Sequence, residues 1–158
     1  MNVSPQLMTA ALAALPLTEL RAALPIAIGS FGLDAGSAFF YSVVGNLVPV
    51  PFVIWLLPSA IAWTSRHWAW AHRTLDTYFF RLKAKHGKSF ERAGMVAIAI
   101  FVAIPLPGTG AWTAAVLSVL FAISPRYSIP GIVAGVLGAG MIVLSITTGT
   151  LGALSWIL

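Results

Sequence analysis

The chain has 158 residues and a formal charge of +5; 59% of the residues are hydrophobic and only 8% are charged. That composition leaves too little polar surface to coat a water-soluble globule of this size, so it favours an all-α integral membrane protein. The absence of cysteine excludes disulfides, a thiolate nucleophile and a Cys-ligated metal site.

Other function classes are disfavoured by the polar residues. The three histidines, His67, His72 and His86, lie in one polar stretch with a spacing that does not place them on one helical face, so we expect no metal site. The apolar segments contain no Ser-His-Asp set and no nucleotide-binding loop, so we expect no enzyme, no cofactor and no ATP hydrolysis. The basic residues lie beside apolar segments, not in a groove-reading motif, so nucleic acid is not an expected partner.

Four apolar stretches organise residues 1–158 as a single membrane domain. They cover residues 7–29, 37–62, 94–123 and 129–158, and each is long enough to reach across about 30 Å of hydrocarbon. No Lys or Arg precedes the first stretch, which continues through charged residues into more apolar sequence. We therefore favour a membrane segment over a cleaved signal peptide.

The first stretch is interrupted by Pro16, Glu19, Arg21 and Pro25. Proline removes helical amides, and non-helical backbone is tolerated in a bilayer only where protein or a water-filled cavity satisfies it. The pattern therefore predicts two short helices that meet at a break and form a re-entrant hairpin.

Glu19 and Arg21 are charged residues within otherwise apolar sequence. A charge at the bilayer centre costs about 2.5 to 3.5 kcal/mol on insertion scales, so a retained pair should be mutually compensated or face water. Positions i and i+2 of a regular helix point about 200° apart, and only a broken backbone lets both side chains converge. We expect Glu19 to accept a proton and Arg21 to hold an anionic substrate group or neutralise Glu19. The alternative places both in a polar turn among the headgroups.

The second stretch is interrupted in its middle by Asn46, Pro49 and Pro51. Freed carbonyls there could coordinate a cation or proton carrier, although kinks in membrane helices are common and a structural role is favoured. Asn46 is retained as a candidate site residue.

A basic connector, residues 63–93, separates a first repeat, residues 1–62, from a second, residues 94–158. Seven of the nine basic residues lie in its segment 64–92: Arg66, Arg73, Arg81, Lys83, Lys85, Lys88 and Arg92. The positive-inside rule makes this connector cytoplasmic, in a multi-pass protein of the inner (plasma) membrane. Its aromatic residues fit an interfacial helix on anionic headgroups: Trp63, Trp68, Trp70, Tyr78, Phe79 and Phe80. A solvated connector is favoured over specific lipid recognition.

The third stretch contains the most unusual local pattern, residues 104–113. Its interrupting residues are Pro105, Pro107, Gly108 and Gly110. These residues cannot form a continuous helix, so amides from Gly108 to Ala111 and the following helix N-terminus suit a phosphate or carboxylate. Thr109 and Thr113 would add hydroxyls, and Trp112 would wall the pocket. The alternative is a proline-kinked span without a ligand.

The last stretch carries Gly131, Gly135, Gly138 and Gly140, a spacing typical of close helix packing in lipid. If both interrupted segments are re-entrant, Arg126 faces the cytoplasm, whereas full crossings would place it outside, against the charge rule. The charge pattern therefore favours an inverted repeat, each half an interrupted hairpin followed by a transmembrane helix. A homodimer that completes the cavity is a further expectation.

Three strings together resemble the putative small multi-drug export protein family: residues 19–25, residues 46–51 and residues 105–113. This family is similar to a branch of the DedA (VTT-domain) group. The resemblance implies paired re-entrant hairpins, an inverted repeat, and proton-dependent movement of lipids or lipid-linked phosphates. Glu19 matches the group's acidic residue in the first hairpin, whereas the group's Arg in the second hairpin has no counterpart.

The leading hypothesis is a proton-coupled transporter with membrane lipids and protons as partners and a lipid, lipid-phosphate or small amphipathic compound as substrate. Arg21 and the free amides favour a lipid phosphate, while Glu19 and the aromatic residues favour a lipophilic cation, so the substrate class stays open. The alternative is a non-transporting structural or assembly protein whose basic connector binds anionic lipid or a partner.

Overall fold

A computed structural model of the chain describes residues 3–67, 88–106 and 108–155, with side chains for 3–63, 93–106 and 108–150. Within these ranges every regular element is an α-helix, as the composition predicts. Residues 68–87, which form most of the predicted interfacial connector, and Pro107 lie outside the described residues.

The first apolar stretch forms two helices, α1 (Pro5–Ala14) and α2 (Glu19–Gly29), separated by residues 15–18. The Ser4 side chain caps α1 by accepting a hydrogen bond from the Leu7 amide, and α1 ends where Leu15 becomes extended. The break at Pro16 is therefore confirmed. The expected interruption at Pro25 is wrong, because Pro25 lies inside α2. A proline costs about 3 kcal/mol in an isolated helix interior, but α2 buries one whole face and this packing outweighs the lost amide.

The second stretch forms α3 (Ala35–Leu47) and α4 (Pro49–His67). Val48 between them keeps helical dihedral angles (φ −53°, ψ −47°). Pro49 and Pro51 fall in the first turn of α4, where a backbone N–H is not required. The interruption is therefore a junction between two consecutive helices.

The second half contains α6 (Lys88–Ala103), α7 (Ala111–Leu120) and α8 (Pro125–Ser155). Residues 104–110 break the third stretch at the predicted place. The glycines of α8 pack as expected: a Cβ on Gly131 would lie 2.7 Å from the Met95 carbonyl oxygen, and one on Gly135 would lie 2.6 Å from the Val102 Cβ. Glycine thus lets α8 approach α6 at backbone distance.

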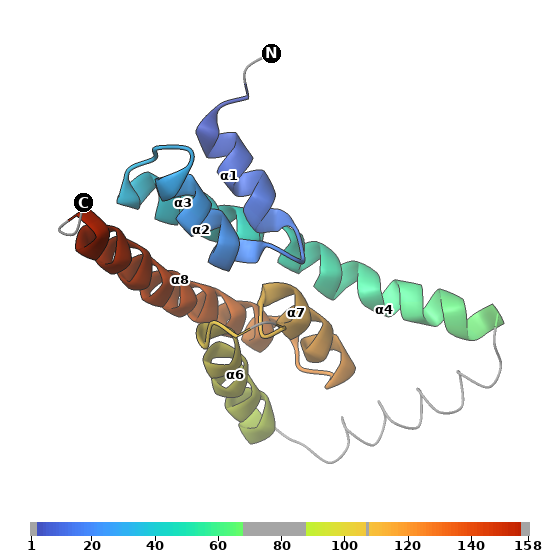
Figure 1. The fold of residues 1–158 in the computed structure, drawn as a ribbon. Coiled ribbons are helices and arrows are strands. Elements are labelled where there is room, and N and C mark those ends of the chain that lie inside the picture. The colour runs from blue at the N-terminus through green and yellow to red at the C-terminus, as the bar shows by residue number, and fades with distance from the viewer. Residues whose placement is uncertain (1–2, 68–87, 107, 156–158) are drawn as a thin grey trace.

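Helices from the two halves pack against each other (Figure 1). In the first half α1, α2 and α3 contact one another; in the second, α8 lies along α6. Across the halves, α8 contacts α2 and α3, and α4 contacts α7. The break after α1 and the break after α6 therefore belong to the same packed set of helices.

Two helical segments are long and apolar enough to cross a membrane: Ala35–Trp63, which combines α3 and α4, and Pro125–Thr150 of α8. Only 39% of each hydrophobic window is buried. Large apolar side chains on both are more than one-third exposed: Phe52, Trp55, Leu56, Leu137, Met141 and Ile146. Such faces suit lipid rather than water. In each half, two shorter helices with a break between them precede one long apolar helix.

Candidate functional site

Glu19 begins α2 with a backbone conformation that is rare for an L-residue. Its φ is +46°, in the left-handed region, which costs about 1–3 kcal/mol for a residue other than glycine. Just before it, the Thr18 hydroxyl donates to the Leu12 carbonyl and fixes the turn. The side chain of Glu19 is directed inward and is only 7% exposed. This turn is the backbone break that lets Glu19 and Arg21 reach the same loop.

The Glu19 carboxylate lies at the N-terminus of α7. The Trp112 amide donates to its Oε1 at 3.4 Å. Gly110, the N-cap residue of α7, offers no side-chain cap. A methyl group at position 110 would overlap both carboxylate oxygens of Glu19. Glu19 therefore caps α7 from another helix, at the end where the helix dipole favours negative charge, and glycine at 110 makes room for it.

Arg21 contacts the same loop at Thr109, three residues before Trp112. Its Nη2 donates to the Thr109 Oγ1 at 2.9 Å, and the Thr109 hydroxyl in turn donates to the carbonyls of Ile104 (2.7 Å) and Leu106 (2.8 Å), which share its one proton. Arg21 also interacts electrostatically with Glu19. The loop therefore positions the guanidinium through one hydroxyl group.

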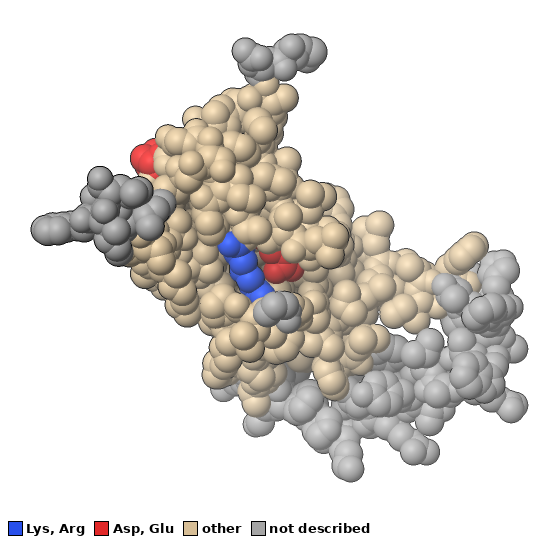
Figure 2. All heavy atoms as spheres, viewed as in Figure 1, with Lys and Arg blue, Asp and Glu red and all other residues tan. Residues whose placement is uncertain are grey.

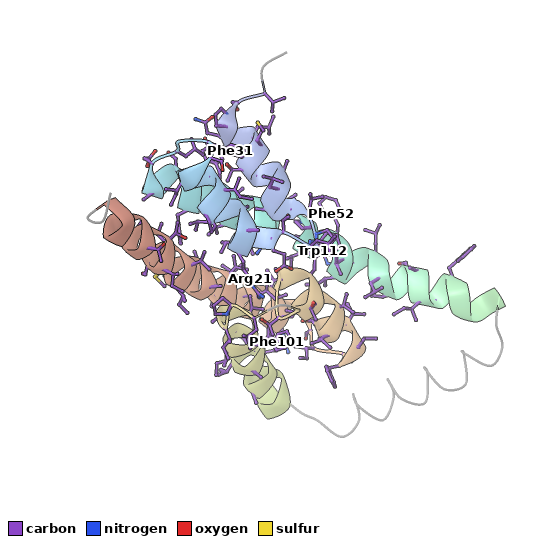
Figure 3. All side chains as sticks on the ribbon, in the orientation of Figure 1. Arg21, Phe31, Phe52, Phe101 and Trp112 are labelled. Atoms are coloured by element: carbon purple, nitrogen blue, oxygen red, sulfur yellow. The ribbon has the colours of Figure 1, made fainter. Side chains whose placement is uncertain are left out.

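Figure 3 labels Arg21 where α2, α7 and α8 meet, and in Figure 2 basic and acidic atoms lie side by side in a hollow at the centre of the same face. Arg21 is partly exposed there, whereas the Glu19 carboxylate lies deeper. The charged pair is therefore accessible from the surface through its basic member.

Trp112 bonds to both sides of the break between α1 and α2. Its backbone amide donates to Glu19, and its indole Nε1 donates to the carbonyl of Ala14 at 3.1 Å. Ala14 is the last residue of α1, so its carbonyl receives no hydrogen bond from within that helix. Trp112 therefore joins the start of α7 to the end of α1 and the start of α2.

The other predicted site residues lie around this contact or apart from it. Pro105 and Thr113 are half-buried, in the loop and in the first turn of α7. Gly108 has φ +84°, a conformation that glycine adopts without strain. Asn46 is buried on α3, and its Oδ1 has no hydrogen-bond partner in the described part of the protein.

Sequence reasoning missed two features of this region. It treated Gly110 as part of a free anion-binding bend, whereas Glu19 itself occupies the place of the anion. It also passed over Ser42, which is fully buried one turn before Asn46 with an unpartnered Oγ. The signal available for Ser42 was its spacing of four residues from Asn46 in an otherwise apolar span.

An apolar cavity of about 410 Å³ lies between α6 and α7. Its lining residues are Ala93, Gly94, Ala97, Ile98, Phe101, Ala114, Leu117, Phe121 and Ile123. Ala114 follows Gly110 by one helical turn, so the cavity begins close to the charged contact. The cavity has the size of a small-molecule site, and its walls suit the apolar part of an amphipathic compound.

A protein-family model described as "Putative small multi-drug export protein" matches residues 19–142 of this chain, which is most of its length. The match begins at Glu19 and includes Arg21 and the whole 104–113 segment. Comparison with curated proteins finds no match, and comparison with solved structures finds none.

Proposed function

This chain belongs to the small multi-drug export protein family, and we propose that it is a proton-coupled transporter of a lipid, a lipid phosphate or a small amphipathic compound. Export is the activity in the family's description, and two helices suited to a bilayer agree with it. The observation that carries the proposal is the contact of Glu19 and Arg21, at the break of the first half, with Thr109 and Trp112, at the break of the second.

The element order supports a repeat architecture of the kind found in secondary transporters. Each half has two short helices around a break and then a long apolar helix. Transporters built from inverted repeats form their sites where interrupted helices of the two repeats meet near the midplane. We propose that both pairs of short helices are re-entrant hairpins, that the halves are inverted, that the chain is a DedA-like protein of the inner membrane, and that connector 64–92 is cytoplasmic.

Protonation of Glu19 supplies the coupling step in this proposal. As a carboxylate, Glu19 accepts a charge-assisted hydrogen bond from Trp112 and balances Arg21. A protonated carboxyl loses the negative charge, and hydrogen bonds to neutral groups are about half as strong as those to ions. The α2–α7 contact then weakens and Arg21 is free to hold an anionic group. Proton binding and rearrangement of the two halves are thereby linked.

The test replaces Glu19 with glutamine, which keeps the size of the side chain but cannot carry the charge. In proteoliposomes with an imposed pH gradient, Glu19→Gln should abolish gradient-driven transport while insertion and folding persist. The matched control is Glu91→Gln, which makes the same substitution at the other glutamate of the sequence, near the start of α6. Full gradient-driven transport by Glu19→Gln would refute the proton role.

Substrate class is tested in the same vesicles with three probes: a fluorescent phospholipid, a polyprenyl phosphate and ethidium. Arg21 beside the α7 N-terminus supports an anionic group, and the apolar cavity between α6 and α7 supports an attached apolar portion. We therefore expect movement of one of the lipid probes in preference to ethidium. Preferential ethidium efflux would instead assign the carboxylate of Glu19 to a lipophilic cation.

A further inference from the structure

Three buried side-chain oxygens of the described residues have no hydrogen-bond partner in the protein: Ser42 Oγ, Asn46 Oδ1 and Ser128 Oγ. Ser118 and Thr147, also buried in helices, satisfy their hydroxyls by donating to the carbonyl four residues earlier. An unpaired buried polar group costs about 1–3 kcal/mol, so a partner outside the protein is expected, and ordered water is the usual one.

Ser42 and Asn46 form a pair, whereas Ser128 lies on another helix. They are four residues apart on α3, a spacing that makes side chains neighbours on one face of a helix. The Gly45 carbonyl is a third acceptor at the same level, because Pro49, four residues later, has no N–H to donate to it. Polar oxygens therefore gather near the α3–α4 junction.

A small residue brings α1 and α3 close together next to this pair. A Cβ on Gly45 would lie 2.7 Å from the Ala10 Cα, so α1 and α3 touch at backbone distance beside Asn46. The fully buried residues that these three helices contribute include four alanines beside Leu20 and Leu24: Ala13, Ala23, Ala27 and Ala38. Ordered water is the usual partner of a buried oxygen that the protein leaves unpaired, as it does Ser42 Oγ and Asn46 Oδ1.

The pair lies along a line that leads towards Glu19. Helices α2 and α3 are joined by residues 30–34, pack against each other and run in opposite directions (Figure 1), so the last turn of α3 lies beside the first turn of α2. Positions 34, 38, 42 and 46 follow one face of α3 at four-residue steps. This face runs from the exposed Asp34 at the helix start to the level of Glu19.

We propose that ordered water held by Ser42 and Asn46 is the route by which protons reach Glu19 from the Asp34 end of α3. The inference rests on the proposed proton role of Glu19 and adds the path. Arg21 is the charged neighbour of Glu19 on its own helix. Helices α1 and α7 contain no titratable residue, α3 contains Tyr41, and the described part of α8 contains Arg126 and Tyr127 in its first turn. The Ser42 and Asn46 side chains thus offer the polar path on this side.

The test compares Ser42→Ala and Asn46→Leu with Ser128→Ala, which also removes a buried unpartnered hydroxyl but on α8. The readout is proton uptake under a fixed gradient, followed by a dye inside proteoliposomes, together with binding of the transported probe. Both α3 variants should slow uptake about a hundredfold, the lower end of the range for positioned proton-transfer groups. Binding of the transported probe should stay unchanged in both α3 variants. The Ser128→Ala variant should match the wild type in proton uptake and in probe binding.

Rescue and controls separate the outcomes. Asn46→Ser keeps a group that can hold water and should recover part of the lost rate, and it also decides the question if Asn46→Leu does not fold. The water route is refuted if Ser42→Ala, Asn46→Ser and any folded Asn46→Leu all take up protons at the wild-type rate. If Glu19→Gln loses coupling in the same experiment, the transporter proposal still stands. If uptake requires Na⁺ and the α3 variants remove that requirement, the oxygens bind a cation and the route is overturned.

Discussion

Gly110→Ala is the sharpest perturbation of the contact between the two halves. A methyl group there would overlap the Glu19 carboxylate, which would have to move by about 2 Å to reach ordinary van der Waals separation. The bond from the Trp112 amide is already 3.4 Å long and would be lost. Because the carboxylate is buried, displacing it from the α7 N-terminus should lower the free energy of unfolding by about 1–3 kcal/mol.

The assay is reversible unfolding of purified Gly110→Ala in detergent, paired with gradient-driven transport in proteoliposomes. Gly149→Ala is the matched control, since it adds the same methyl group to a glycine of α8 with no atom within 4 Å. Combining Gly110→Ala with Glu19→Gln measures the coupling between the positions, and the double variant should lose less than the sum of the single losses. If Gly110→Ala is as stable and active as Gly149→Ala, the Glu19 carboxylate does not lie on the α7 N-terminus.

Two further substitutions separate the remaining contacts. Trp112→Phe removes the hydrogen bond from the indole to the Ala14 carbonyl but keeps the backbone amide that donates to Glu19. It should lower the free energy of unfolding by about 1 kcal/mol and leave proton-coupled transport measurable. Loss of coupling as complete as in Glu19→Gln would show that the indole, and not only the amide, is needed for coupling. Thr109→Val removes the hydroxyl that positions Arg21, so probe affinity should fall while a rescue by Thr109→Ser restores it; equal affinity of wild type and Thr109→Val would show that Arg21 does not depend on this loop.

Local chemistry accounts for the features that the sequence predicted well. Pro16 and the Pro105–Gly110 string remove helical amides or favour non-helical dihedral angles, and both breaks lie where these residues predicted them. Pro25 misled the prediction because its cost is outweighed by burial of Leu20, Ala23 and Leu24, which depends on neighbouring helices. Pro49 and Pro51 became a junction because they fall in a first helical turn. Proline chemistry thus indicates a weak point, and packing decides whether the helix ends there.

Long-range contacts explain what the sequence could not predict. The amides from Gly108 to Ala111 were predicted to be free donors, but the Thr109 amide donates to the Leu106 carbonyl within the same loop. The amide that finds a distant partner is the next one, Trp112, which donates to Glu19, about ninety residues earlier, across a left-handed backbone turn. The same holds for the Ala14 carbonyl, whose partner is the Trp112 indole. Motifs therefore revealed which groups need partners, and the fold determines which partners they find.

The occupied helix N-terminus has a consequence for any anionic substrate under the proposed function. Glu19 and a substrate anion would compete for the same donors, the Trp112 amide and the Arg21 guanidinium, and the Glu19 carboxylate already fills the space beside Gly110. An anion can therefore enter only when Glu19 is protonated or displaced, since two negative charges in a buried site repel strongly. A proton that neutralises Glu19 then accompanies each anion that Arg21 holds. The proton gradient would then be linked to transport because the Glu19 carboxylate and the substrate anion take turns at the same place, the N-terminus of α7.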